Sequence, residues 1–542
     1  MQIKPITKVG ERAGEDRRRD VPVVIWIDAI CINQKDVAER SAQVRIMAEI
    51  YQQAFQVVIW LGEHDPQSRR AFEWVRYAES RLPPAIRGMT LDQIMSGIEL
   101  VKTAIRWWFE VIIFEGKVLV GIRETFDIFT QRRNWWTRKW IVQEFSLARH
   151  ARLQCGNTQL DWDATMNVWN AISAVPPYFT QHSKGIGSGD TYMRPLDDCR
   201  RRIRKSKLSL GEVIDLCWHQ KATDRRDNVY ALLSLCFVSD RLDPDYMKTV
   251  VQVYEDATKE LIANDQDLNS LCQRRRCIHS EAQKIATFPS WTVDIGREYY
   301  SGFGPQWYKT YETFSACDGA VHDPALLLSS KANELLVRAV QCDEVSSITT
   351  FFELTSSSSW ENPDAMMRRA HAWWNDNRAF FDAEPKIAVK DIIETVRMEE
   401  DTTSGNLWSD RYETTWVDLT DLTSDLFAEP EICGYCDKMH GKQHSDDAEL
   451  LILSLDNHFG CGWMLCRMSS GRLSWIPNTA EVGDRVFVVN GCNMPLVLKT
   501  LPTEPHHHPA YSLVGHCYVH GIMHGEWVRD GVAERAELIR LL

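Results

Sequence analysis

The sequence of 542 residues lacks the features of several protein classes. Its 15 cysteines are an odd number without the spacing of a disulfide framework, which favours reduced thiols and a cytoplasmic location. It has no signal-peptide core and no uncharged apolar run long enough to cross a bilayer, so we expect no membrane span. Basic residues number 62 against 75 acidic ones, and the net charge of −13 disfavours nucleic-acid binding.

Phosphate-binding and metal-binding motifs are also scarce. The sequence has no Walker A motif, no nucleophile elbow and no glycine-rich dinucleotide fingerprint. One group of zinc-type ligands is present, formed by Cys433, Cys436, His440 and His444. Its central spacing is much shorter than that of a zinc finger, so we predict a loop with incidental thiols and imidazoles and no metal site.

The composition is that of a globular chain with several domains. Apolar residues make up 44% of the sequence and charged residues 25%, and the length exceeds that of one ordinary core. We predict an α/β N-terminal domain, a mostly helical middle and a β-rich C-terminal unit. The expected boundaries are 1–20 for a flexible N-terminus, 21–157 for the α/β domain with a helical insertion at about 66–130, 158–300 for the helical region, 301–447 for a mixed region with linkers, and 448–542 for the β-rich unit.

Residues 23–63 have the pattern of a strand, a helix and a second strand. The apolar runs at 23–30 and 56–61 predict two neighbouring parallel strands, and helix 36–53 is expected to cross one face of their sheet. Asp36 is the expected N-cap, and Glu39 three residues later is the expected partner in a capping box.

Two long segments resemble one protein family. They are "WIDAICINQKDVAERSAQVRIMAEIYQQAFQVVIWLGE" (26–63) and "RNWWTRKWIVQEFSLARHARLQCGN" (133–157), and both resemble the signature of the fungal heterokaryon incompatibility (HET) domain. Later blocks such as "DRRDNVYALLSLC" (224–236) look like those that follow the domain in many members. The resemblance implies a role in fungal non-self recognition and programmed cell death, with an unknown protein partner or self-association.

The same resemblance implies a fold and a chemistry. HET domains are distantly similar to TIR domains, which are flavodoxin-like modules with a parallel sheet. TIR domains that cleave NAD carry a catalytic glutamate in a Trp-Cys-x-x-Glu pattern, and "WIVQE" has Trp140 and Glu144 at that spacing, with Ile141 in place of the cysteine. The strand and loop that usually precede "WIDAICINQ" are not recognisable, so we expect a sheet that lacks its first strand and an activity that is weak or absent.

Four residues are candidates for a site. Glu144 is the expected catalytic residue, and Asp28, Arg138 and Trp140 are expected to bind NAD, which is a substrate here and not a cofactor. An aromatic plate beside a carboxylate suits a sugar, and Asp28 at a strand end is expected to face the same ligand.

Structural interpretations of these residues stay open. Asp28 could cap the following loop, and Glu144 could pair with Arg138 or Arg133 beside a buried Trp140. Arg40 could pair with Asp28 or Asp36. Two functional classes also stay open, an NAD glycohydrolase of TIR type and a non-catalytic module whose assembly recruits death machinery.

Overall fold

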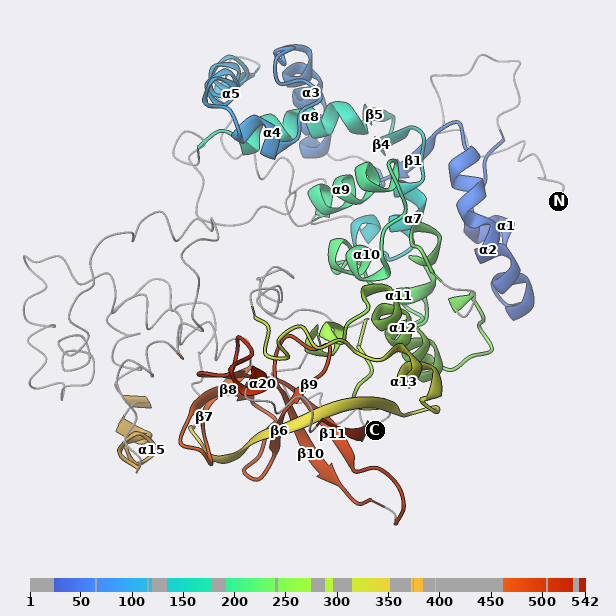
Figure 1. Cartoon of the computed structure of the whole chain (residues 1–542). Helices are drawn as coiled ribbons and strands as arrows, with labels where there is room; N and C mark the ends of the chain where they lie inside the picture. The colour runs from blue at the N-terminus through green and yellow to red at the C-terminus, as the bar shows by residue number, and fades with distance from the viewer. Residues whose placement is uncertain are drawn as a thin grey trace, which may run out of the picture. The chain divides into compact units, whose positions relative to one another are not determined.

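The computed structural model describes most residues between 24 and 350 and between 462 and 542. The described residues are 24–63, 66–114, 117–118, 134–176, 192–238, 242–273, 288–295, 314–350, 372–373, 375–383, 395, 462–503, 505–529 and 536–542. The chain divides into two compact units, Met1–Glu260 and Leu261–Leu542 (Figure 1). The predicted flexible N-terminus at 1–20 and the cysteine and histidine group at 433–444 lie outside the described residues.

A three-stranded sheet lies in the first unit. Its order is β1 (Val57–Trp60), β4 (Ala151–Cys155) and β5 (Thr158–Asp161). β1 and β4 are parallel, and β4 and β5 are antiparallel. The predicted strand at 56–61 is confirmed as β1, and the α/β character of this region is confirmed. The flavodoxin-like strand order stays a prediction.

The predicted strand at 23–30 is wrong. Residues 24–27 form no strand, and α1 (Asp28–Cys31) is a short helix. The ring of Trp26 packs edge-on against Tyr51, with 5.5 Å between ring centroids. The apolar run is only partly buried here, since Val24 is 59% and Ile30 63% exposed, and its apolar residues predicted a strand that does not form.

The predicted helix at 36–53 is confirmed as α2 (Val37–Gln53). Asp36 is its N-cap, because the Asp36 carboxylate accepts hydrogen bonds from the backbone N–H groups of Ala38 and Glu39. The capping box is not completed as predicted, since the Glu39 carboxylate accepts from the Asn33 N–H at 3.1 Å. Glu39 therefore ties the loop before the helix to its first turn.

Helices make up most of the rest of this unit. They are α3 (Pro66–Ser80), α4 (Leu91–Met95), α5 (Ile98–Val111), η1 (Asn134–Thr137), α7 (Ile141–Ser146), α8 (Trp162–Ser173), α9 (Arg194–Ile203), α10 (Leu210–Leu216), α11 (Asp227–Tyr230), η3 (Leu233–Leu235) and α12 (Val250–Asp265), with a short hairpin of β2 (Ile113–Phe114) and β3 (Lys117–Val118). The predicted helices in the middle of the chain are confirmed in the described ranges, and the helical insertion at about 66–130 stays a prediction. Within those ranges no helix combines the length and apolarity needed to span a membrane.

The second unit is β-rich, as predicted for its C-terminal part. Its strands are β6 (Leu335–Ile348), β7 (Trp463–Met468), β8 (Leu473–Pro477), β9 (Arg485–Val489), β10 (Leu496–Leu501), β11 (Ala510–His516), β12 (Tyr518–Val519) and β13 (Glu537–Leu541), joined by the short segments η5 (Asn269–Gln273), α13 (Pro324–Ser329), α15 (Arg378–Asp382) and α20 (Glu526–Arg529).

Strand β6, the long yellow strand in Figure 1, organises this unit and was not predicted. Its first half pairs with β13, its middle with β9 and its end with β7. Because β13, β11, β10 and β9 also pair in that order, these four strands and β6 form a closed ring. Closure leaves these strands no unpaired edge along the ring.

Substitution of Gly491 tests the close packing of Gly491 against His322 in the second unit. Its φ is +86°, and a Cβ atom there would lie 2.8 Å from the Cβ of His322 and 2.9 Å from the His322 backbone nitrogen. We expect Gly491→Ala to destabilise the protein by clearly more than the roughly 1–2 kcal/mol of a left-handed non-glycine residue. Gly483→Ala is the matched control, because its φ is +92° and its added Cβ would meet nothing within 4 Å. Equal melting temperatures for the two variants would contradict the packing argument.

Candidate functional site

Glu144 lies on a short helix that is buried throughout. All six residues of α7 are buried, and Glu144 is 9% exposed. In the described part of the chain its carboxylate has no hydrogen-bond partner. Burial raises the pKa of Glu144 to about 7, the charge of Arg138 lowers it, and the charge of Asp28 adds to the rise. The predicted catalytic residue is therefore a carboxyl group that titrates near neutral pH.

Arg138 and Asp28 accompany Glu144. Arg138 precedes α7, and Asp28 is the first residue of α1. The guanidinium of Arg138 lies 3.6 Å from the Asp28 carboxylate, and both side chains are partly exposed. Both charges act on Glu144, so three of the four predicted site residues converge. We call Asp28, Arg138 and Glu144 the carboxylate site.

Two aromatic residues at this site were not predicted to take part. Helix α2 packs against α7, and burial together with the charges of Glu144 and Asp28 raises the pKa of the Tyr51 hydroxyl. The Tyr51 hydroxyl has no hydrogen-bond partner among the described residues. The indole nitrogen of Trp26, whose ring packs on Tyr51, is buried and also has none in those ranges. No local sequence signal singles out either residue.

Trp140 is directed to a different cluster. Its indole N–H donates to Asp227 at 3.1 Å. Because that donor is used within the protein, only the ring of Trp140 is free for a ligand. The predicted role of Trp140 in NAD binding stays untested, and its observed polar contact is structural.

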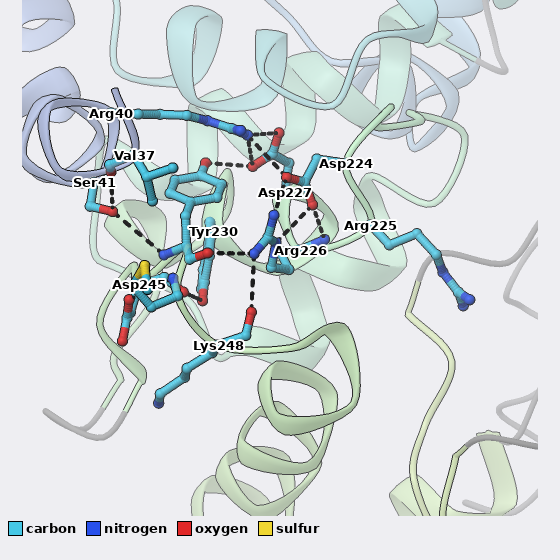
Figure 2. Close-up of polar contacts among 12 residues, drawn as sticks. Val37, Arg40, Ser41, Asp224, Arg225, Arg226, Asp227, Tyr230, Asp245 and Lys248 are labelled. Atoms are coloured by element: carbon cyan, nitrogen blue, oxygen red, sulfur yellow. Dashed lines mark hydrogen bonds and ion pairs between the residues drawn. The ribbon is translucent and has the colours of Figure 1, made fainter. Parts of the chain in front are cut away.

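Asp227 is the centre of an ion-pair network that Figure 2 shows in close-up. The guanidinium of Arg40 donates to Asp224 at 3.3 Å and to Asp227 at 3.1 Å. The Tyr246 hydroxyl donates to the other oxygen of Asp227 at 2.5 Å, and Arg40 lies 3.7 Å from the centre of the Tyr246 ring. Burial raises the pKa of Asp227, while its bond from Tyr246, the charge of Arg40 and its bond from Trp140 lower it.

The expected partners of Arg40 were wrong. Asp36 uses its carboxylate to cap α2, and Asp28 pairs with Arg138, so neither binds Arg40. The observed partners are 184 and 187 residues away in sequence. No local pattern identifies such partners, because the ion pair depends on how α2 packs against the segment around α11.

Arg226 extends the network. It pairs with Asp224 at 2.8 Å and donates to the backbone carbonyls of Tyr246 at 2.6 Å and Lys248 at 3.0 Å (Figure 2). Burial alone would raise the pKa of Asp224, but the hydrogen bonds and charge of Arg226 lower it overall. The network therefore joins α2, α11 and the segment before α12, and through Trp140 it reaches the start of α7.

Metal binding has no support in the described ranges. Within them no group of three or more histidine, cysteine, aspartate or glutamate side chains is placed to hold a metal ion. The cysteines of the same ranges form no disulfide with one another.

Comparisons with known proteins identify the family of the N-terminal region. The family model of the heterokaryon incompatibility protein (HET) matches residues 2–144. The chain therefore contains a HET domain within residues 2–144. The matched residues end at Glu144 and include the whole carboxylate site, Tyr51 and Trp26.

A relative extends the similarity beyond the HET domain. The heterokaryon incompatibility protein 6, OR allele, of Neurospora crassa is 24% identical over 594 aligned positions, which cover 94% of this chain and 82% of the relative. No solved structure matches the chain. The two matches support a role of this HET-domain protein in fungal heterokaryon incompatibility.

Proposed function

We propose that this HET-domain protein acts in the cytoplasm of a fungal cell in non-self recognition that ends in cell death, and that its carboxylate site cleaves NAD. The observation that carries the proposal is Glu144, a buried carboxyl group without a hydrogen-bond partner in the described ranges. The TIR-like spacing of Trp140 and Glu144 adds to it.

The chemistry follows from the charge of the substrate. A desolvated carboxylate gains from a nearby cation, and the nicotinamide ring of NAD carries a positive charge. When the bond between ribose and nicotinamide breaks, its electron pair moves to the nicotinamide nitrogen and the positive charge moves to the ribosyl group. An ionised Glu144 would stabilise that charge. Water then adds to the ribosyl carbon and releases a proton, which gives nicotinamide and ADP-ribose.

Arg138 and Asp28 set how much of Glu144 is ionised. Arg138 lowers the pKa of Glu144, and Asp28 raises it. Because the reaction needs the ionised form, nicotinamide release should rise with pH and level off above an apparent pKa of about 7.

Substitutions of Arg138 and Asp28 should shift the pH dependence of nicotinamide release in opposite directions. Arg138→Gln removes a positive charge and should move the midpoint of the kcat/KM profile to higher pH. Asp28→Asn removes a negative charge and should move it to lower pH. The measurement is nicotinamide release between about pH 5.5 and 8.5, with Lys102→Gln as a control, since Lys102 is exposed and paired with Glu99 on α5. A profile without a midpoint near 7, or shifts in the same direction, would contradict the assignment.

The direct test uses purified full chain and NAD. We expect free nicotinamide by chromatography, either from the protein alone or from protein concentrated by a crowding agent. Absence of nicotinamide under both conditions would remove the catalytic proposal and leave the incompatibility role.

A second candidate is assembly without catalysis, and an apolar surface near β1 favours it. Phe55 is 86% exposed, and Val58 and Trp60 on β1 are each 47% exposed. Exposed apolar side chains on a strand are suited to contact with another chain. Trp60→Ser should then abolish concentration-dependent association in light scattering, and cell death would be lost without any nicotinamide release by the unmodified protein.

A further inference from the structure

Two hydrogen-bond donors beside the carboxylate site have no acceptor. The indole nitrogen of Trp26 is buried without a hydrogen-bond partner in the described ranges. The hydroxyl of Tyr51, whose side chain is partly buried, has no partner among the described residues. Buried polar groups without a partner are rare in folded proteins, because each costs the free energy of its lost hydration. The indole nitrogen of Trp26 is such a group, so its unused donor calls for an explanation.

These two donors and the carboxylate site form one constellation. The Trp26 and Tyr51 rings are 5.5 Å apart between centroids at an angle of 81°. Helix α2, which carries Tyr51, packs against α7, which carries Glu144, and Asp28 follows Trp26 by two residues. Arg138 belongs to the same group, because its guanidinium lies 3.6 Å from the Asp28 carboxylate.

We propose that Trp26 and Tyr51 are ligand-binding residues of the HET domain, which donate hydrogen bonds to oxygen atoms of the nicotinamide-ribosyl part of NAD. This inference rests on the proposed function. An indole N–H can only donate, so the group opposite Trp26 must be an acceptor, such as a hydroxyl or carboxamide oxygen. The two rings offer apolar edges to the flat base and the sugar, while Glu144 faces the positive charge.

Glu144 and the two aromatic residues are expected to act at different stages of the reaction. Glu144 acts on the charge that develops in the reaction, and Trp26 and Tyr51 hold neutral oxygens that exist before and after it. Loss of either donor should therefore weaken binding, whereas loss of Glu144 should affect the bond-breaking step.

The experiment measures NAD binding separately from cleavage. Calorimetric titration with NAD uses the Glu144→Gln chain, which keeps the ligand intact, and compares it with the same chain carrying Tyr51→Phe or Trp26→Phe. Each second change should raise Kd about tenfold, the effect of one lost hydrogen bond of about 1.4 kcal/mol. The control is Tyr77→Phe, which alters a tyrosine on α3 that stacks with Arg81.

Thermal unfolding distinguishes binding from a structural role. The Tyr51 hydroxyl has no partner to lose in the described ranges, so Tyr51→Phe should leave the melting temperature unchanged or raise it. A lower melting temperature with unchanged Kd would overturn the proposal, as would equal Kd values for Tyr51→Phe and Tyr77→Phe.

The measurements of binding and cleavage can contradict the ligand-binding inference and the NAD-cleavage proposal separately. If NAD binds and the two variants weaken it, but the unmodified protein releases no nicotinamide, the ligand-binding inference stands and the catalytic proposal fails. If nicotinamide is released and Tyr51→Phe binds NAD normally, only the inference fails. If NAD does not bind to any form of the chain, both fail.

Discussion

Glutamine in place of Glu144 is expected to abolish nicotinamide release and to make the protein more stable above pH 7. The substitution is nearly isosteric, so the packing of α7 should be kept. It removes the negative charge that would stabilise the ribosyl cation, and the loss of one such electrostatic contact lowers a rate by about 10²–10³-fold. Cell death on overexpression should be lost together with nicotinamide release.

The gain in stability follows from the burial of the same charge. The pKa of Glu144 is about 7 in the folded protein, against an ordinary value of 4.5. Between these values the unfolded chain loses its proton while the folded chain keeps it, so stability falls as pH rises through this window. The total loss is about 3 kcal/mol, and it is complete above pH 7. Glutamine has no charge to bury and avoids this loss.

The measurement is thermal unfolding of the full chain from pH 4 to pH 8. The unmodified protein and Glu144→Gln should melt alike at pH 4, and the variant should melt higher at pH 8. Glu99→Gln is the matched control, because Glu99 is exposed on α5 and pairs with Lys102, which lowers its pKa. A Glu144→Gln protein that is less stable at every pH would identify Glu144 as a structural ion-pair partner.

Alanine in place of Arg40 is expected to destabilise the protein by about 3 kcal/mol at neutral pH, the lower end of the effect of breaking a buried ion pair. The change removes the only cation that contacts both Asp224 and Asp227 among the described residues, and it also removes the stacking on Tyr246. The buried charge of Asp227 then lacks the nearby positive charge of Arg40 that offsets the cost of its burial. The loss should be smaller in acid, where Asp227 takes up a proton.

Arg45→Ala is the control for this effect. Arg45 lies on the same helix and pairs with Asp243 at 2.7 Å, but both side chains are about half exposed. Such a pair contributes less than about 1 kcal/mol. In a double-mutant cycle, Arg40→Ala and Asp227→Asn together should lower the free energy of unfolding by less than the sum of the two single changes. The reason is that Asp227→Asn removes the buried negative charge that Arg40→Ala leaves unpaired by Arg40. Additive costs in urea unfolding would show that the two residues do not depend on each other.

The candidate site was predictable only in part. Glu144, Arg138 and Asp28 could be named because a family motif and a strand-like run mark their positions. Tyr51 and Trp26 could not, since nothing in their local sequence distinguishes an aromatic residue with an unpaired donor from an ordinary core residue. Whether a donor is paired depends on the elements packed against it.

The sequence alone determined the local elements. The apolar period and the acceptor side chain of Asp36 specify α2, and the β-branched run at 57–60 specifies β1, because helix caps and side-chain periodicity act within a few residues. Tertiary structure decided the rest. It left residues 24–27 outside the sheet, gave Arg40 its partners at Asp224 and Asp227, and paired β6 with strands from the far end of the chain. These choices depend on contacts between segments far apart in sequence, and their energies are set by burial and geometry that no local pattern contains.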